Sequence, residues 1–356
     1  CSWCPKPSMK LHLVVLVVTV VATSGRSSSL ELLGNNELQF ATSCPNDADI
    51  RPCECIVSSD GFSLDMDCSK VQDEEQLKAV FQADFPTSAF RRFTIHQNKQ
   101  LRILRDGTFN YVTFEEIWIT DGILEKIEDA ALSDSASTAR NLIFNLNNIS
   151  IFPFSILSNF EELLSLDLRV NNLQGFPKLT SSTLKILYLS HNPLGSLPVD
   201  AFGGTPSITD LHLSNTKITE ILPGTLQGLP KLRNIGLGNN QLKELVENSV
   251  QCNSNTGLVD LGYNELRTVH PNAFPGFRSG WLYIHHNYIT TLEENVWRIL
   301  VEHDGYLDPY GNPLLCGCDI AWLLNNATLR DAVDKYTTCA DGRKLIDLNP
   351  TDYDHC

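Results

Sequence analysis

The stretch Leu184-x-x-Leu187-x-Leu189-x-x-Asn192-x-Leu194, in which x is any residue, holds the phrase that decides the fold. The same phrase stands at residues 163–173 and 232–242. Its polar position recurs ten times, at steps of 21 to 25 residues and mostly 24, at Asn98, Gly122, Asn147, Asn171, Asn192, Thr216, Asn240, Asn264, Asn287 and Asn312. A period of this length predicts a solenoid built from one repeated unit.

Each unit is expected to begin with a short strand, because apolar residues at alternate positions place one face of the chain inside. The turn after the strand leaves backbone groups inside the coil that need partners. An asparagine amide offers two donors and an acceptor, so stacked asparagines can satisfy successive turns. This structural ladder is expected at Asn98, Asn147, Asn171, Asn192, Asn240, Asn264, Asn287 and Asn312. Thr216 can do part of this work and Gly122 none, so the Gly122 coil is expected to use water or neighbouring backbone.

The units must stack, because a single repeat cannot bury its own leucines. The sequence therefore predicts an α/β solenoid over residues 90–313: a leucine-rich repeat horseshoe of about ten repeats, with a parallel β-sheet on its concave face. Segments with Gly and Pro, such as 200–204 and 272–277, predict turns and short helical pieces on the outer side.

The cysteines cluster at the two ends of the repeats, where a solenoid needs lids. Four precede the repeats and four follow them, at Cys44, Cys53, Cys55, Cys68, Cys316, Cys318, Cys339 and Cys356. Even numbers at tight spacing predict disulfide-stapled caps over 44–89 and 314–356, formed in an oxidising compartment. Zinc sites are the weaker interpretation, because neither cluster has CxxC pairs with histidines at ligand spacing. The spacing leaves three connectivities open in each cap.

The N-terminal residues have the pattern of a secretory leader. Met9 and Lys10 precede a mostly apolar run over 11–22, which predicts a signal peptide at 9–25 followed by a tail at 26–43. Residues 1–8 are then interpreted as an artefact or an untranslated leader. No second apolar stretch is found, so we expect no membrane anchor and a secreted, extracellular protein. Two sequons, at Asn148 and Asn326, are candidate glycosylation sites.

Removing the leader leaves one cysteine, Cys252, outside the two caps. It is either a buried thiol, which we favour, or a partner in a bond to another chain. The formal net charge is -15, and losing Lys6 and Lys10 makes it -17 (-15 minus 2). An acidic surface argues against nucleic acid and anionic membranes as partners.

Motifs of enzymes and cofactor sites are absent from the sequence. It has no GxSxG, HExxH or phosphate-loop motif, so no enzyme activity and no cofactor are expected. His285-His286 is the one pairing that suggests a metal. Adjacent residues of a strand point to opposite sides or diverge at its end, so we expect the two not to share an ion.

The caps and repeats together resemble secreted arthropod leucine-rich repeat proteins. The segment 311–323, GNPLLCGCDIAWL, is the most specific motif for that resemblance. Within this group the chain is most similar to the family of crustacean non-catalytic luciferase subunits. The resemblance implies that Cys44 pairs with Cys55, Cys53 with Cys68, Cys316 with Cys339 and Cys318 with Cys356. It also implies a glycoprotein that associates with and stabilises another protein.

The outward positions of the strands predict a binding face. Exposed aromatic residues are the usual contacts of protein interfaces, and the candidates on the concave side are Tyr188, His212, Tyr263, Trp281, Tyr283, His285 and Tyr306. The alternative is that the C-terminal cap folds over Trp281 and Tyr306 and buries them.

The sequence thus favours a secreted, non-catalytic protein-binding scaffold whose partner is another extracellular protein. A soluble innate-immune receptor for a lipid or glycan shares the same features, so a small-molecule or glycan ligand stays open. A structural protein of the extracellular matrix is a third hypothesis, for which Cys252 is the one sequence feature. Fold alone does not separate these functions.

Overall fold

A computed structural model describes residues 43–302 and 304–356 of the chain. Residues 42–356 form one compact unit. The leader at 1–8, the signal peptide at 9–25 and nearly all of the tail at 26–43 lie outside the described residues.

One twelve-stranded sheet runs through this unit, in the order β1-β2-β3-β5-β7-β8-β9-β10-β11-β13-β15-β16. Only β1 and β2 pair antiparallel; all later neighbours are parallel. The bounds are β1 Glu54–Val57, β2 Leu64–Asp67, β3 Ala89–His96, β5 Thr113–Thr120, β7 Asn141–Ile143, β8 Ser165–Asp167, β9 Ile186–Tyr188, β10 Asp210–His212, β11 Asn234–Gly236, β13 Leu258–Asp260, β15 Gly280–Tyr283 and β16 Gly305–Asp308.

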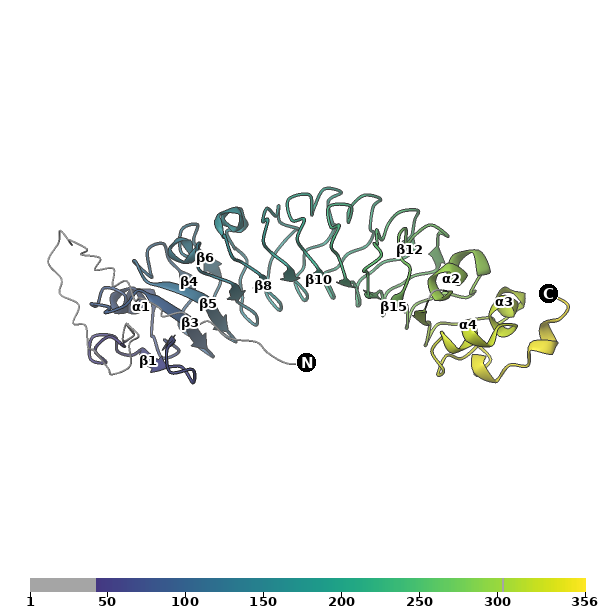
Figure 1. The fold of residues 1–356 in the computed structure, drawn as a ribbon, viewed down its shortest axis with the longest axis horizontal. Coiled ribbons are helices and arrows are strands. Elements are labelled where there is room, and N and C mark those ends of the chain that lie inside the picture. Colours follow the sequence, from purple (N-terminus) through teal and green to yellow (C-terminus); the bar gives the residue numbers. More distant parts are fainter. Residues whose placement is uncertain (1–42, 303) are drawn as a thin grey trace, which may run out of the picture. The chain divides into compact units, whose positions relative to one another are not determined.

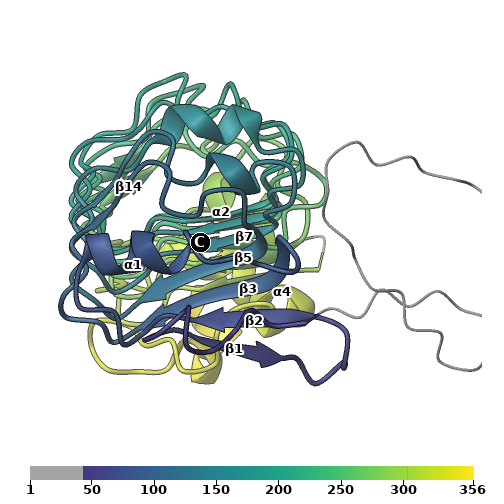
Figure 2. The ribbon, with the colours of Figure 1, turned by 90° about the vertical axis from the view of Figure 1, so that its left-hand side faces the viewer.

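The strands from β3 to β16 confirm the predicted fold of about ten repeats. They lie along the inner side of the arc of coils (Figure 1). The sheet goes two strands further than the repeats, because the β1–β2 hairpin of the N-terminal cap continues it beside β3 (Figure 2).

The outer side of the coils holds mainly turns and short elements. Two small parallel sheets lie there, β4 (Ile103–Leu104) with β6 (Lys126–Ile127) and β12 (Glu244–Leu245) with β14 (Thr268–Val269). The α-helices are α1 Glu74–Val80, α2 Glu294–Val301, α3 Ala321–Leu324 and α4 Ala327–Asp331. The 3-10 helices are η1 Ser133–Ser135, η2 Phe154–Asn159, η3 Cys318–Ile320, η4 Leu345–Asp347 and η5 Pro350–Tyr353.

The core is a continuous stack of apolar side chains inside the coils. The central residue of each three-residue strand is buried, as at Leu187 and Leu211, while its two neighbours face the sheet surface. Beneath the N-terminal cap the stack changes to phenylalanine, with edge-to-face ring pairs such as Phe81–Phe109 at 5.2 Å and Phe93–Phe109 at 4.9 Å. These rings give the end of the solenoid a dense apolar plug.

Disulfides join Cys44 to Cys55 and Cys53 to Cys68 in the N-terminal cap, and Cys316 to Cys339 and Cys318 to Cys356 in the C-terminal cap. These are the pairs that the resemblance implies. A bridge of this kind stabilises a small cap by about 2–4 kcal/mol, so the lids do not depend on apolar burial alone.

The asparagine ladder joins each coil to the one before it. In Asn240, Nδ2 donates to the carbonyl oxygens of Leu237 in its own coil and Leu213 in the preceding coil, both at 2.9 Å. Its Oδ1 accepts from the backbone N–H groups of Thr216 at 3.0 Å and Ile218 at 3.1 Å. The cross-coil bond from an N–H to Oδ1 repeats at Asn147, Asn171, Asn192, Asn264, Asn287 and Asn312.

Three ladder positions depart from this pattern. At Gly122 the Oδ1 of Asn147 lies only 2.7 Å from where a Cβ would stand, so the side chain of the next ladder residue occupies the space beside the glycine. In Asn98, which precedes Gly122, Oδ1 accepts from Gln100 and Leu101 within its own coil. Thr216 donates only to Leu213 in its own coil and to Asn240. The backbone N–H groups of the preceding coil therefore donate no hydrogen bond to the side chain of Thr216.

The hydrogen bonds of the ladder predict how much stability is lost when one of its asparagines is removed. Asn240→Ala removes the partners of two buried N–H groups, so it should lower the free energy of unfolding by about 1–3 kcal/mol. Asn255→Ala, at an exposed asparagine of the same region, should change it by less than about 0.5 kcal/mol. Denaturant titration measures both, and equal stability of the two variants contradicts the role of the ladder.

The C-terminal cap should lose its two bridges in a fixed order. Cys318 and Cys356 are exposed, whereas Cys316 and Cys339 are buried, and thiol–disulfide exchange needs access to sulfur. Under mild reduction, alkylation should label Cys318 and Cys356 before Cys316 and Cys339, as read by peptide mass spectrometry. Labelling of the buried pair first overturns this assignment.

Candidate binding face

Strand register sorts the outward side chains of the sheet into columns. One column contains Leu258, Trp281 and Tyr306 on β13, β15 and β16, and the next contains Asp260, Tyr283 and Asp308 on the same strands. Neighbouring residues of a column lie about 5 Å apart, the spacing between strands. Outward residues about 24 positions apart in the sequence are therefore neighbours on this face.

A further column lies just beyond the strand ends. The residue before each ladder position has a positive φ in every repeat, at Gln97, Asp121, Leu146, Val170, His191, Asn215, Asn239, Tyr263, His286 and Gly311. Because the turn is the same each time, neighbours in this column also meet. Tyr263 stacks on His286 at 4.4 Å between ring centroids, and Asn215 hydrogen-bonds His191 at 2.7 Å.

Two acidic residues in the N-terminal part of the face pair with arginines. Asp65 pairs with Arg91 on the next strand. Glu116 binds Arg92 at 2.7 Å, and the Arg92 guanidinium lies 3.9 Å from the ring centroid of Trp118. These two carboxylates are therefore neutralised within the chain.

Tyr188 and His212 form a separate pair in the middle of the sheet. Their rings stack at 4.5 Å, and the Arg169 guanidinium lies 4.6 Å from the Tyr188 centroid. The guanidinium also binds Asp167, whose side chain is 5% exposed, at 2.6 Å. Burial lowers the pKa of His212, which favours its neutral imidazole. β11, with Gly236 at the outward position, separates this pair from the aromatic residues that follow.

The C-terminal part of the face carries a continuous run of ring contacts, which we call the aromatic strip. The centroid distances are 4.6 Å for Tyr306–Trp281, 6.1 Å for Trp281–Tyr283, 6.1 Å for Tyr283–His285, 5.1 Å for His285–Tyr263, 4.4 Å for Tyr263–His286 and 5.4 Å for His286–Tyr310. Five of the seven residues predicted from the sequence lie in this strip. His286 and Tyr310 were not predicted.

Two glycines make room for the histidines of the strip. A Cβ at Gly262 would lie 2.3 Å from the ring of His285, and one at Gly311 would lie 2.7 Å from the ring of His286. Each of the two imidazoles therefore packs against the backbone of a glycine. The rings do not diverge as expected from their adjacent positions: their centroids are 5.6 Å apart and both contact Tyr263.

The C-terminal cap touches the strip without covering it. The hydroxyl of Tyr306 donates to Asp334 of the cap at 3.1 Å. Trp281 stays 50% exposed, Tyr263 52% and Tyr310 43%. The alternative in which the cap buries Trp281 and Tyr306 is thus wrong for Trp281, while Tyr306 is partly buried.

Carboxylates border the strip. Burial raises the pKa of Tyr283, and the facing charges of Asp308 and Asp260 raise it further. Burial also raises the pKa of Asp308; the Tyr310 N–H and His285 act against this, and Asp334 adds to it. No ion pair among residues 43–302 and 304–356 includes Asp260, Asp308 or Asp334.

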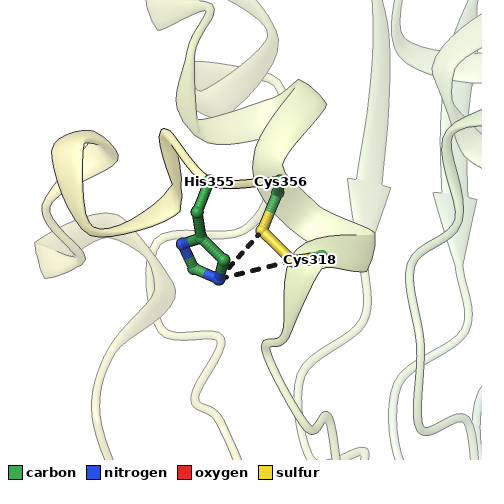
Figure 3. Close-up of side chains that lie close together, drawn as sticks. All are labelled: Cys318, His355 and Cys356. Atoms are coloured by element: carbon green, nitrogen blue, oxygen red, sulfur yellow. Dashed lines mark hydrogen bonds between the residues drawn. A yellow bond between two sulfur atoms is a disulfide. The ribbon is translucent and has the colours of Figure 1, made fainter.

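One group in the described part of the chain has the composition of a metal site: Cys318, His355 and Cys356. The imidazole points at both sulfurs, with Nε2 3.8 Å from Cys318 and 3.7 Å from Cys356 (Figure 3). Those sulfurs form a disulfide, and a disulfide sulfur is not the thiolate that binds metals. The cluster is a part of the cap.

Three further sequence features have clear positions. Cys252 is a buried free cysteine, and burial raises its thiol pKa to about 12, so its location does not support a bond to another chain. Asn148 and Asn326, the two sequon asparagines, are exposed. No helix among the described residues is long and apolar enough to cross a membrane.

Capped coils, a sheet on the inner face and an asparagine ladder define a leucine-rich repeat protein, and a family model described as "Leucine rich repeat" matches residues 182–242. The chain is 36% identical over 313 residues to the Oplophorus-luciferin 2-monooxygenase non-catalytic subunit of Oplophorus gracilirostris, with 87% of each chain covered. It belongs to the family of that subunit. Osteomodulin of Bos taurus is 27% identical over 109 residues, which cover 30% of this chain and 26% of osteomodulin.

Solved structures show the same fold. A chain of the TLR13–ssRNA13 complex matches with a TM-score of 0.59 and 24% identity over 68% of this chain, which spans only 35% of that one. A chain of the octameric complex of Latrophilin 3, Unc5D and FLRT2 matches with a TM-score of 0.68 and 18% identity, covering 83% of this chain and 91% of that one. At these identities the likeness concerns the fold alone.

The carboxyl of Asp308 should make stability depend on pH. Burial raises its pKa in the folded state, so folding favours the protonated carboxyl, and the stabilisation present at low pH is lost as pH rises above 3.8, the ordinary pKa of an aspartic acid. Asp308→Asn should therefore melt at a higher temperature than wild type at pH 7, with the difference vanishing near pH 3. Asp352→Asn, at an exposed acid, is the control; a lower melting temperature for Asp308→Asn at pH 7 contradicts the burial of this charge.

Proposed function

We propose that this chain is a secreted, non-catalytic scaffold that binds another extracellular protein through its concave face. The observation that carries the proposal is the aromatic strip, whose residues Trp281, Tyr263 and Tyr310 are left exposed on an open sheet. Large aromatic side chains dominate the binding energy of protein interfaces. Exposed aromatic clusters on soluble proteins also mark interaction sites.

Family membership supports a role beside another protein. The Oplophorus relative is named as the non-catalytic subunit of a monooxygenase, and a subunit has a partner. By analogy, this chain associates with a catalytic chain and stabilises it, without contributing residues to the reaction.

Secretion is supported by several features that point the same way. The cap disulfides need an oxidising compartment. Residues 9–25 have the composition of a signal peptide, and both sequon asparagines are accessible to a glycosyltransferase. The proposed organisation is therefore a cap at 44–89, repeats at 90–313 and a cap at 314–356.

Capture of the partner tests the proposal. The tagged, secreted chain is incubated with an extract of its own tissue, and bound molecules are identified by mass spectrometry. The variant Tyr263→Ala/Trp281→Ala should lose the partner protein, because it removes two rings of the strip that are about half exposed, Tyr263 at 52% and Trp281 at 50%. Capture with the variant Tyr188→Ala tests whether the pair Tyr188–His212 contributes to partner binding.

The matched control is Tyr336→Ala, which removes a ring that is 58% exposed on the C-terminal cap. It should retain the partner. Equal capture by wild type and the double variant contradicts the proposed face, and recovery of lipid or glycan in place of protein favours a soluble receptor.

A further inference from the structure

Ion pairing differs among the outward carboxylates of the concave face. On β2, β5 and β8, arginines bind Asp65, Glu116 and Asp167, whereas Asp67 and Asp210 have no ion pair within the described residues. Around the aromatic strip, none of the three carboxylates Asp260, Asp308 and Asp334 has an ion pair within the described residues either. These three are distinguished by the aromatic rings that lie beside them.

The carboxylates and rings alternate in a way that suits one class of group. Tyr283 stands directly between Asp260 and Asp308 in its column, and Trp281 stands beside Tyr306 in the next. Two strand spacings separate the Cα atoms of the two aspartates by about 10 Å. A planar cation can lie over the Tyr283 ring with a carboxylate on either side.

The local bonds of the carboxylates leave acceptors for a ligand. Asp260 Oδ1 accepts from the Gly262 N–H at 2.9 Å, and Asp308 Oδ1 accepts from the Tyr310 N–H at 3.0 Å. These bonds fix one oxygen of each side chain, and no hydrogen bond is found to Oδ2 of either residue within the described part of the chain. Both aspartate side chains are therefore half-buried and held in a fixed orientation.

We propose that this surface takes a basic segment of the partner protein, with an arginine side chain over Tyr283 and Trp281 and between Asp260 and Asp308. A guanidinium stacks on aromatic rings and donates to carboxylates in the same plane. Charge complementarity argues for it, because the partner supplies to these carboxylates the cation that Asp65, Glu116 and Asp167 receive from arginines of the chain itself. This inference rests on the proposed function and names the chemistry of the partner.

The test uses a defined probe, a Gly/Ser peptide that carries a run of arginines, with a matched peptide that carries glutamates. Binding to the full secreted chain is measured by isothermal titration calorimetry at physiological salt. The arginine peptide should bind and the glutamate peptide should not. Asp260→Asn/Asp308→Asn keeps a side-chain Oδ1 that can accept from each backbone N–H and removes both charges, so it should weaken binding about tenfold or more, the order of effect of a lost charge-assisted hydrogen bond.

Asp352→Asn/Asp354→Asn changes the net charge equally at exposed cap positions and should weaken binding less than about twofold, as expected for a remote screened charge. Failure of the arginine peptide to bind, or equal weakening by both variant pairs, overturns the inference. Trp281→Ala should also weaken binding. Circular dichroism and a single cooperative melting transition show that each variant folds.

The peptide assay needs no native partner, so its outcome is separate from that of the capture experiment. If capture shows that Tyr263→Ala/Trp281→Ala loses the partner but Asp260→Asn/Asp308→Asn keeps it, the scaffold function stands and the basic-segment inference falls. If no variant changes capture, the proposed function falls, and the peptide result alone decides whether this surface binds arginine.

Discussion

The cross-coil bonds of the ladder asparagines are the constraint on which the rest of the structure depends. A coil interior offers no water to its turn, so the backbone N–H and carbonyl groups there need partners inside the protein. Each ladder amide supplies them for its own coil and for the preceding one, as Asn240 does for Leu213 and Ile218. The bond thereby sets the stacking register as well as satisfying the turn. Stability then accumulates from coil to coil, and only the ends need disulfides.

Fixed register produces the binding face. Because every repeat places equivalent residues about one strand spacing from the next, side chains distant in sequence assemble into columns without any long-range packing. Aromatic residues of the neighbouring strands β15 and β16 therefore become one strip, and the turn before each ladder residue adds Tyr263 and His286 to it. Gly262 and Gly311 matter for the same reason: the missing side chain leaves space for a histidine ring of the neighbouring repeat, His285 of the next repeat and His286 of the preceding one.

Much of this followed from the sequence, since contacts in a solenoid are made at a fixed period. The ladder, the strands and most of the strip could be located by counting from one asparagine to the next. The direction of His286 and Tyr310 could not, because the alternation that predicts orientation ends with the strand, and His286 turns back with φ of 52°. The contact between Tyr306 and Asp334 was also hidden, because the cap has no repeat. Which carboxylates are paired could be seen only from side-chain positions: Arg169, two residues beyond the end of β8, binds Asp167 of its own repeat and not a residue of a neighbouring strand.

Hydroxyl-radical footprinting of the secreted chain, alone and with its captured partner, tests the central claim most directly. The account predicts that oxidation of Trp281, Tyr263 and Tyr310 falls on binding, while Tyr336 on the cap and Tyr111, which lies outside the strip, are oxidised as before. Protection of Tyr111 or Tyr336 with unchanged oxidation of Trp281 would place the partner elsewhere and contradict the assignment of the concave face.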